Sequence, residues 1–262
     1  MRTGISLPIF TDAATLVDLA VEAESAGWDG VFLWDHLVWR PELKLDVHDP
    51  WVLLGAIAAR TERVRLGTLI TPLARRRPWV VAKHLTTLDH LTGGRAVLGV
   101  GLGEPPDADF AAFGDPSAGR DRAARLDEGL TLLDGLLRGP VDHHGTHYTA
   151  TTELRPRPVQ QPRPPVWVAA VAPNRRPLER AARWDGVVPL VFPEGTPTPD
   201  ELAAYVGGVE APAGWDVVAF WRTGVPAAEY ADAGATWLVE APWPDGDWVA
   251  RVRARLAAGP GA

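Results

Sequence analysis

The sequence predicts a single-domain (β/α)₈ barrel over residues 1–262, and three observations lead to this fold class. Apolar strands alternate with helices along the chain, which is typical of a parallel sheet covered by helices. The strands predicted at residues 30–34, 64–70 and 96–100 each end in polar or glycine residues, and a helix follows. The chain length suits one barrel, which typically takes about 250 residues. Because such folds carry their chemistry at the carboxyl ends of the strands, we expect these three ends to line one site.

Residues that cap helices mark out the first four strand–helix pairs. Thr11 or Asp12 is the expected N-cap of the first helix, and Gly27 is its C-terminal cap. Asp49 is the expected cap of the second helix, with Pro50 in the first turn. This spacing predicts strands near 3–8, 30–34, 64–70 and 96–100, and helices from the first cap to Gly27 and at 50–61, 79–91 and 122–137.

A proline-rich excursion interrupts the alternation at residues 139–165, and a short hairpin is expected there around 146–151. The alternation then resumes. Strands are expected at 166–171, 186–191, 216–221 and 236–240, with helices near 176–184, 199–206, 226–233 and 247–256. The chain therefore holds eight strand–helix pairs, the number that closes this type of barrel.

Composition excludes several classes of function. The formal net charge is −7 and acidic and basic residues are interspersed, which argues against nucleic acid or an anionic membrane as a partner. The chain has no cysteine, so disulfides, thiolate catalysis and cysteine-ligated metals are excluded. The N-terminus has the pattern of a strand rather than a signal peptide, and no apolar run suffices to span a bilayer. We therefore expect a cytoplasmic protein.

The helix predicted at residues 50–61 is apolar nearly all round. An outer-ring helix of a barrel needs only one apolar stripe to cover the sheet. We therefore expect its outer face to be buried against a second copy of the chain in a homodimer.

Asp35 and His36 directly follow a predicted buried strand. A histidine beside a carboxylate can donate or accept a proton near neutral pH, and barrel sites lie at strand ends. The alternative is that Asp35 caps a turn and His36 is a structural histidine.

The segment from Gly99 to Gly103 is rich in glycine, but it departs from the dinucleotide-binding fingerprint because Glu104 stands where the third glycine would be. Glycines at a strand end, such as Gly101 and Gly103, remove side chains so that a flat ring can lie against the backbone. Glu104 is then either a proton donor or ring contact, or a solvated loop carboxylate.

Two basic segments are candidates for binding phosphate. Asn174, Arg175 and Arg176 follow the fifth predicted strand, where a helix N-terminus and guanidinium donors combine. Their alternative is an ordinary N-cap with surface arginines. The run 75–77, Arg-Arg-Arg, is interpreted as a solvated basic loop.

Three histidines lie close together in the sequence, at His143, His144 and His147. The expected hairpin breaks helical ligand spacing, and no acidic partner is near in sequence, so we predict no metal site. Twelve tryptophans are present, and Trp34, Trp39, Trp51 and Trp79 fall near strand ends and helix starts. Most are expected in the core, while one or two are candidates to stack on an aromatic ligand.

Motifs along residues 1–190 resemble the bacterial luciferase-like superfamily, whose members use reduced FMN or the deazaflavin coenzyme F420. The matching segments occur in the family's order and are specific for it. They are 27–36 (GWDGVFLWDH), 49–51 (DPW), 60–68 (RTERVRLGT), 88–95 (LDHLTGGR), 99–103 (GVGLG), 110–114 (FAAFG), 161–168 (QPRPPVWV) and 181–186 (AARWDG).

The resemblance implies a (β/α)₈ barrel that binds a flat tricyclic ring at its C-terminal mouth. It implies that Asp35 contacts the ring and that His36 is the catalytic acid/base. Thr68-Leu69 matches the position of a non-proline cis peptide that supports the ring in many members.

Further residues take their expected roles from the same resemblance. Thr71, Gly101 and Gly103 match positions that line the ring, and Asn174-Arg175-Arg176 loosely matches the phosphate end. Glu104 falls where deazaflavin members that oxidise sugar phosphates carry a catalytic glutamate.

The resemblance implies an oxidoreductase or monooxygenase that acts on a small organic molecule with F420 or FMN. Glu104 favours F420 slightly, as does Leu102, which replaces an arginine that luciferase uses to bind the FMN phosphate. The family also contains shortened, non-catalytic flavin-binding or storage barrels. This is the alternative reading, because the insertion that usually covers the site is nearly absent between Val191 and Trp215.

Overall fold

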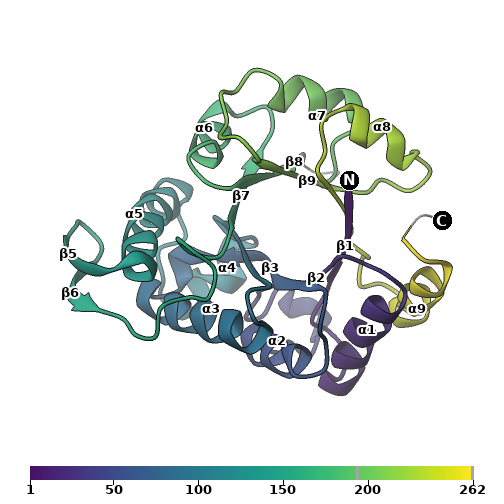
Figure 1. Cartoon of the computed structure of the whole chain (residues 1–262), viewed down its shortest axis with the longest axis horizontal. Coiled ribbons are helices and arrows are strands. Elements are labelled where there is room, and N and C mark those ends of the chain that lie inside the picture. Colours follow the sequence, from purple (N-terminus) through teal and green to yellow (C-terminus); the bar gives the residue numbers. More distant parts are fainter. Residues whose placement is uncertain (193–194, 261–262) are drawn as a thin grey trace.

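The computed structural model describes residues 1–192 and 195–260 and confirms the barrel (Figure 1). Eight parallel strands close in the order β1-β10-β9-β8-β7-β4-β3-β2. Every expected strand is present, with ends shifted by at most two residues. The strands are β1 Arg2–Leu7, β2 Gly30–Leu33, β3 Arg65–Pro72, β4 Ala96–Gly101, β7 Val166–Val171, β8 Gly186–Leu190, β9 Asp216–Phe220 and β10 Trp237–Glu240.

Helices form a ring around the barrel (Figure 1). The Asp12 carboxylate accepts a hydrogen bond from the Thr15 amide at 2.9 Å, so Asp12 rather than Thr11 caps the first helix. Among the described residues, no helix combines the length and apolarity that crossing a bilayer requires. The helices are α1 Ala13–Ser25, α2 Pro50–Ala58, α3 Pro78–Thr92, α4 Pro106–Asp109, α5 Gly119–Arg138, α6 Arg175–Ala181, α7 Pro199–Val206, α8 Ala227–Asp232 and α9 Trp248–Ala258, with 3₁₀ turns at Pro41–Leu43, Leu73–Arg75 and Ala111–Phe113.

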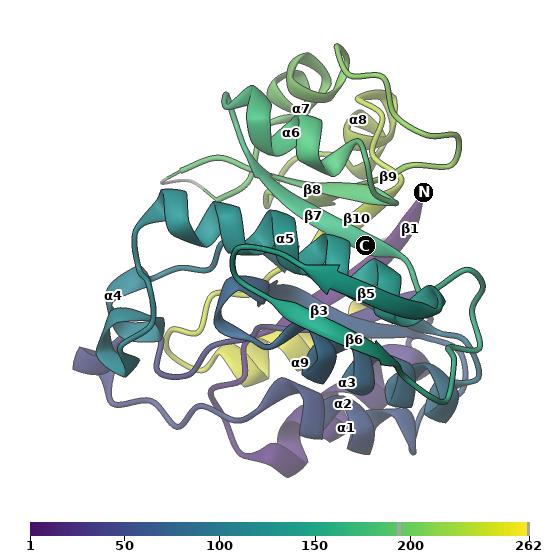
Figure 2. The same cartoon turned by 90° about the vertical axis from the view of Figure 1, so that its left-hand side faces the viewer.

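The hairpin is longer than expected and begins earlier. Strands β5 Pro140–His144 and β6 Thr149–Glu153 pair antiparallel and lie outside α5 (Figure 2). The Glu128 carboxylate on α5 accepts hydrogen bonds from the amides of His147 and Tyr148 in the turn, at 2.6–3.0 Å. This contact fixes the hairpin against α5. Because it joins residues that are distant in sequence, the turn residues alone could not predict where the two strands begin and end.

Large aromatic rings fill the interior of the barrel. The ring centroids of Phe32 and Trp237 lie 5.8 Å apart, and the ring centroid of Trp167 lies 5.4 Å from each of these two. Gly30 provides the room, because a Cβ there would come within 2.9 Å of both Phe32 and Trp237. Burying three such rings removes a large apolar surface from water and stabilises the closed barrel. The inner cluster also contains Leu69, Val97, Val188, Val218 and Val239.

The backbones of β3 and β4 approach each other closely, and their register shifts between Thr68 and Thr71. A Cβ added to Gly67 would collide with the backbone oxygen of Val97, and one added to Gly99 would collide with that of Thr68. Both glycines are therefore required by strand packing. The non-proline cis peptide joins Leu69 and Ile70, one residue later than Thr68-Leu69, where the resemblance placed it.

Burial within the chain accounts for most of the apolar character of α2. Its inner residues, Leu54 and Ile57 among them, are fully buried. Val52, Ala56 and Ala59 remain exposed at spacings of four and three residues, so they share one outer stripe.

The close approach of β3 and β4 predicts that Gly67→Ala lowers the free energy of unfolding by about 1–3 kcal/mol, since a Cβ overlaps backbone that cannot yield cheaply. Urea denaturation followed by tryptophan fluorescence measures this change. Gly55→Ala in α2 is the control, because a Cβ there meets no atom within 4 Å and helix propensity favours alanine. Equal stability of the two variants would contradict the packing role of Gly67.

Candidate active site

The carboxyl ends of β2, β3 and β4 meet at one end of the barrel, as the sequence predicts. Asp35 follows the end of β2, and Thr71, near the end of β3, donates a hydrogen bond from its hydroxyl group to Asp35 Oδ2 at 2.8 Å. Pro72 on β3 is paired with Gly101 on β4. The Thr68 hydroxyl lies 2.8 Å from that of Thr71, and both side chains are fully buried beneath Asp35. They therefore support the Asp35 carboxylate from the inside of the fold.

Asp35 is buried and held by two arginines. Arg75 Nη2 donates to Asp35 Oδ1 at 2.6 Å, and Arg76 donates through Nη2 and Nε to the two carboxylate oxygens at 2.7 and 2.9 Å. The expectation that residues 75–77 form a solvated basic loop is therefore wrong for two of the three residues. A buried carboxylate needs a cation, and the arginines reach it because the 3₁₀ turn after β3 brings them back over the strand end.

Asp109, which sequence reasoning missed, holds His36. Its Oδ2 lies 2.7 Å from His36 Nδ1, and Arg75 Nη1 donates to the same oxygen at 3.0 Å. Its Oδ1 accepts from the backbone amides of Leu37, Val38 and Trp39 at 2.9–3.3 Å. His36 therefore takes its carboxylate partner from α4, 73 residues away in sequence, and not from its neighbour Asp35. The one signal in the sequence that could have pointed to Asp109 is its position directly before residues 110–114, a segment that resembles the family.

Electrostatics keep the Asp109 carboxyl ionised. Burial alone raises the pKa of Asp109, but hydrogen bonds from His36 and from the Val38 amide, with the charge of Arg75, outweigh it and hold this pKa well below its usual range. At neutral pH Asp109 therefore acts only as a hydrogen-bond acceptor.

Aromatic side chains surround His36. The ring centroids of Phe10, Trp34 and Trp39 lie 6.0–6.2 Å from that of the imidazole. Trp243, from the connection after β10, packs against Trp34 and Trp39 and is half exposed. Two of the four tryptophans singled out from the sequence, Trp34 and Trp39, thus gather beside the imidazole, which keeps a side-chain exposure of 16%.

Glu104 lies at the edge of this region. Its side chain is 57% exposed, and its nearest charged partner is Arg122, with Nη2 3.4 Å from Oε1. Arg122 also donates to the carbonyl oxygen of Gly103. Glu104 makes no hydrogen bond to His36 among the described residues, so the geometry shows a solvated carboxylate near the strand end.

The two strand-end glycines differ in their surroundings. A Cβ on Gly101 would come within 3.1 Å of both Ile70 and Ala169, which are partly exposed. At Gly103, where φ is +85°, a Cβ would collide with Pro72 and Phe110. The missing side chain of Gly103 therefore also serves internal packing and an unusual backbone conformation.

The predicted phosphate end is partly occupied by the protein itself. Arg175 donates to the carbonyl oxygens of Tyr205 and Gly208 at 3.3 and 3.1 Å. Asn174 is the N-cap residue of α6, as the alternative reading expects, but its side chain makes no cap hydrogen bond. Arg176 is exposed. The two arginines thus differ, since Arg175 bonds to α7 and to the residue stretch that follows it.

The three hairpin histidines do not converge. His143 Nε2 lies 3.3 Å from Glu128, and His144 Nε2 lies 3.0 Å from Asp142, so the expectation that no acidic partner is near was wrong. Among the described residues, no three histidine or carboxylate side chains form a group able to hold a metal ion.

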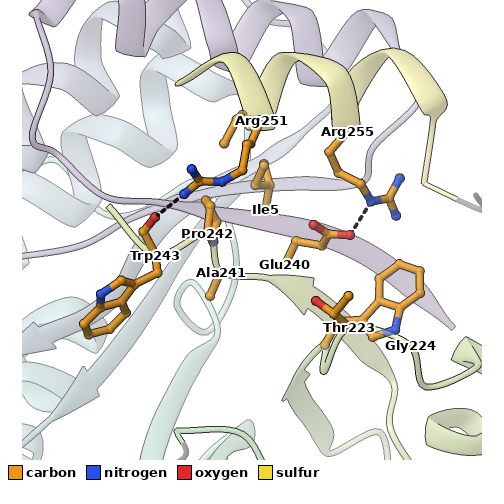
Figure 3. Close-up of a pocket in the computed structure, with 11 residues that line it drawn as sticks. Ile5, Thr223, Gly224, Glu240, Ala241, Pro242, Trp243, Arg251 and Arg255 are labelled. Atoms are coloured by element: carbon orange, nitrogen blue, oxygen red, sulfur yellow. Dashed lines mark hydrogen bonds and ion pairs between the residues drawn. The ribbon is translucent and has the colours of Figure 1, made fainter. Parts of the chain in front are cut away.

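A cavity of about 630 Å³ lies between α9 and the residues at and after the ends of β9 and β10, and Trp243, which packs against Trp34 and Trp39, is part of its lining (Figure 3). Arg251 donates to the Trp243 carbonyl oxygen at 3.1 Å, and Arg255 is paired with Glu240. Both arginines that line this cavity thus already have partners in the chain.

Comparison with known proteins assigns the class of this fold and site. The family model described as luciferase-like monooxygenase matches residues 1–205. The chain therefore belongs to the luciferase-like monooxygenase family.

Two curated relatives are named F420-dependent glucose-6-phosphate dehydrogenase. The one from Microbacterium testaceum is 39% identical over 60% of this chain, and the one from Beutenbergia cavernae is 43% identical over 61%. Each match covers 47% of the relative, so the chain matches about half the length of these proteins.

Solved structures share the fold over nearly the whole chain. An F420-dependent secondary alcohol dehydrogenase in complex with an F420-acetone adduct has a TM-score of 0.77 at 17% identity, covering 99% of this chain and 98% of that one. The F420-dependent tetrahydromethanopterin reductase of Methanopyrus kandleri has a TM-score of 0.75 at 17% identity, covering 99% and 97%. At this identity the likeness concerns the fold alone.

The lowered pKa of Asp109 predicts how Asp109→Asn depends on pH. The stabilisation by the native carboxylate is complete above the ordinary carboxyl pKa of 3.8 and is lost as pH falls toward the lower native value. The difference in unfolding free energy between wild type and variant should therefore be constant near about pH 5 and narrow toward about pH 3. Urea denaturation at a series of pH values measures it. Asp18→Asn, which breaks an exposed pair with Arg60, is the control and should change stability by under about 1 kcal/mol. A difference for Asp109→Asn that stays constant on acidification would refute the assignment.

Proposed function

We propose that this protein is an oxidoreductase that uses a reduced or oxidised flavin-type cofactor, coenzyme F420 in the first place and FMN in the second, on a small organic substrate. The observation that carries the proposal is His36, an imidazole at a strand end of the barrel, fixed by Asp109 through Nδ1 at 2.7 Å. The names of the curated relatives support F420, as do Glu104 and Leu102 in the β4–α4 connection.

The residues at the mouth suit a planar, largely apolar ring. Ile70 and Ala169 lie so close to Gly101 that a Cβ there would come within 3.1 Å of both, so these three residues form an apolar wall with no side chain projecting from Gly101. Leu190 and Phe220, partly exposed, continue this apolar surface above the inner cluster. These residues would hold the ring, the fully buried Asp35 would fix the strand end beside it, and Arg176 is available to its phosphate end. When bound, the cofactor would supply hydride transfer or oxygen activation.

The role of the chain is to manage the proton. In the oxidation of an alcohol, His36 Nε2 would accept the proton of the substrate hydroxyl, while the bound cofactor would supply the acceptor for the hydride that leaves carbon, so that a carbonyl group remains. In the reverse direction His36 returns the proton to oxygen. The aromatic wall of Phe10, Trp34 and Trp39 limits the access of water to the imidazole, and a positioned acid/base of this kind contributes about 10²–10⁴ in rate.

The proposal predicts that His36→Ala binds cofactor as wild type does and loses about 10²–10⁴ in turnover, because only the proton transfer is affected. Separate titrations with F420 and FMN, followed by tryptophan quenching, measure binding. Turnover is followed by the cofactor spectrum, with candidate alcohols for F420 and with oxygen for reduced FMN.

His144→Ala, at an exposed hairpin position, is the matched control and should behave as wild type. Unchanged kinetics of His36→Ala would remove this residue from the mechanism. Cofactor binding without turnover in the wild type would instead favour a flavin-binding or storage barrel.

We also propose that the protein is a homodimer through α2. The exposed stripe of Val52, Ala56 and Ala59 is uncharged, and a two-fold axis would place it against the same stripe of a second copy. Val52 is 74% exposed and is the largest side chain of the stripe.

The homodimer predicts that Val52→Asp shifts the protein from dimer to monomer at micromolar concentration, because two carboxylates would face each other across the axis. Size-exclusion chromatography with light scattering measures the mass. Val159→Asp, at an exposed apolar position in the β6–β7 connection, is the control and should leave the mass unchanged. A monomeric wild type would exclude the proposed interface.

A further inference from the structure

We propose that Asp109 is the positioning residue of His36, which keeps a proton on Nδ1 and thereby makes Nε2 the atom that exchanges a proton with the substrate. The inference rests on the proposed function only for the identity of the reaction. The assignment of the proton to one nitrogen follows from contacts within the chain.

The hydrogen-bond inventory around Asp109 determines which nitrogen is protonated. Oδ1 accepts hydrogen bonds from three backbone amides, those of residues 37–39. Oδ2 accepts a hydrogen bond from Arg75 Nη1 and is also in contact with His36 Nδ1. Amides and guanidinium only donate, so the carboxylate is surrounded by donors and has no proton to offer. Nδ1 must therefore carry the hydrogen in the 2.7 Å contact. The neutral imidazole then has its lone pair on Nε2, to which no group is hydrogen-bonded in the described part of the chain.

The same contacts fix the orientation of the ring. The amides that anchor Oδ1 belong to the three residues directly after His36, so carboxylate and imidazole are held by one short segment. The Asp109 side chain is only 1% exposed, and Arg75 joins it to Asp35 by donating to both carboxylates. Rotation of the imidazole would break the contact to Oδ2 and leave a buried acceptor short of a donor, which is unfavourable.

The carboxylate also complements the charge that His36 gains. When Nε2 takes a proton, the ring becomes a cation with both nitrogens protonated, and the ionised Asp109 lies next to the positive charge. Arg75, shared with Asp35, prevents Asp109 from competing for that proton. Asp109 therefore acts through His36 and does not need to touch substrate or cofactor.

Nuclear magnetic resonance of the imidazole tests the assignment without any turnover. In wild-type protein with ¹⁵N-labelled histidine, two-bond ¹H–¹⁵N correlation at high pH should show His36 with a protonated-type shift at Nδ1 and an unprotonated-type shift at Nε2. The signals are assigned by their loss in His36→Ala. Asp109→Asn, whose side-chain amide can donate, should shift the population toward the other tautomer. A wild-type His36 that is protonated on Nε2 would overturn the proposal, even if Asp109→Asn does not fold.

A double-mutant cycle separates positioning from a merely structural role. Asp109→Asn should lower kcat by about 10²–10⁴ with little change in KM, and should cause no further loss when His36 is already alanine. Asp89→Asn is the matched control, because Asp89 is also a buried carboxylate but bonds to Gln160 at 2.7–2.8 Å, away from His36. It should lower stability and leave the His36 spectrum and kcat unchanged.

Two outcomes of the cycle count against the proposal. Losses that multiply in the double variant would show that Asp109 acts independently of His36, and an equal effect of Asp89→Asn on kcat would show that general destabilisation is responsible. If neither cofactor supports turnover in the wild type, the proposed function fails, while the tautomer measured by resonance still decides the role of Asp109.

Discussion

The candidate site depends on a buried network of two carboxylates and two arginines. Arg75 donates to Asp35 and to Asp109, and Arg76 completes the coordination of Asp35. These four residues come from the connections after β2, β3 and β4, so the network ties three strand ends together. Burying charges is costly unless each is paired and hydrogen-bonded, and removing one partner of such a pair typically costs about 3–5 kcal/mol. The network therefore holds the mouth in one arrangement.

Below this ionic network, the barrel is held together by the packing of aromatic rings. The lower barrel is filled by Phe32, Trp167 and Trp237, which fit because glycines on β1 and β2 leave them room. The layer above is more open, where Ile70, Leu190 and Phe220 are only partly buried. The base of the barrel is closed and aromatic, and its mouth is open and apolar with one ionic edge. Together they form a rigid site at the carboxyl ends of the strands, where barrels of this type carry their sites.

The family assignment and the site occupy the same part of the chain. The matching model ends at residue 205, and Asp35, His36 and Asp109 lie well inside it. Helices α8 and α9, with the connection that carries Trp243, lie beyond it. The shared part holds the contact between His36 and Asp109, while the part outside the match contributes Trp243 to the aromatic residues around His36.

The barrel could be predicted from the sequence alone, because the alternation of buried strands with capped helices is a local pattern that each segment carries independently. It also located Asp35, His36, Thr71 and Gly101 at one end, since parallel strands bring their carboxyl ends together. Which side chains pair with one another became apparent only in the folded structure. His36 is adjacent to Asp35 in sequence but bonds to Asp109, and the arginines after β3 are buried rather than solvated. Side chains that are neighbours in sequence often point apart, whereas loops that are distant in sequence meet above the sheet, and no periodicity in the chain encodes that meeting.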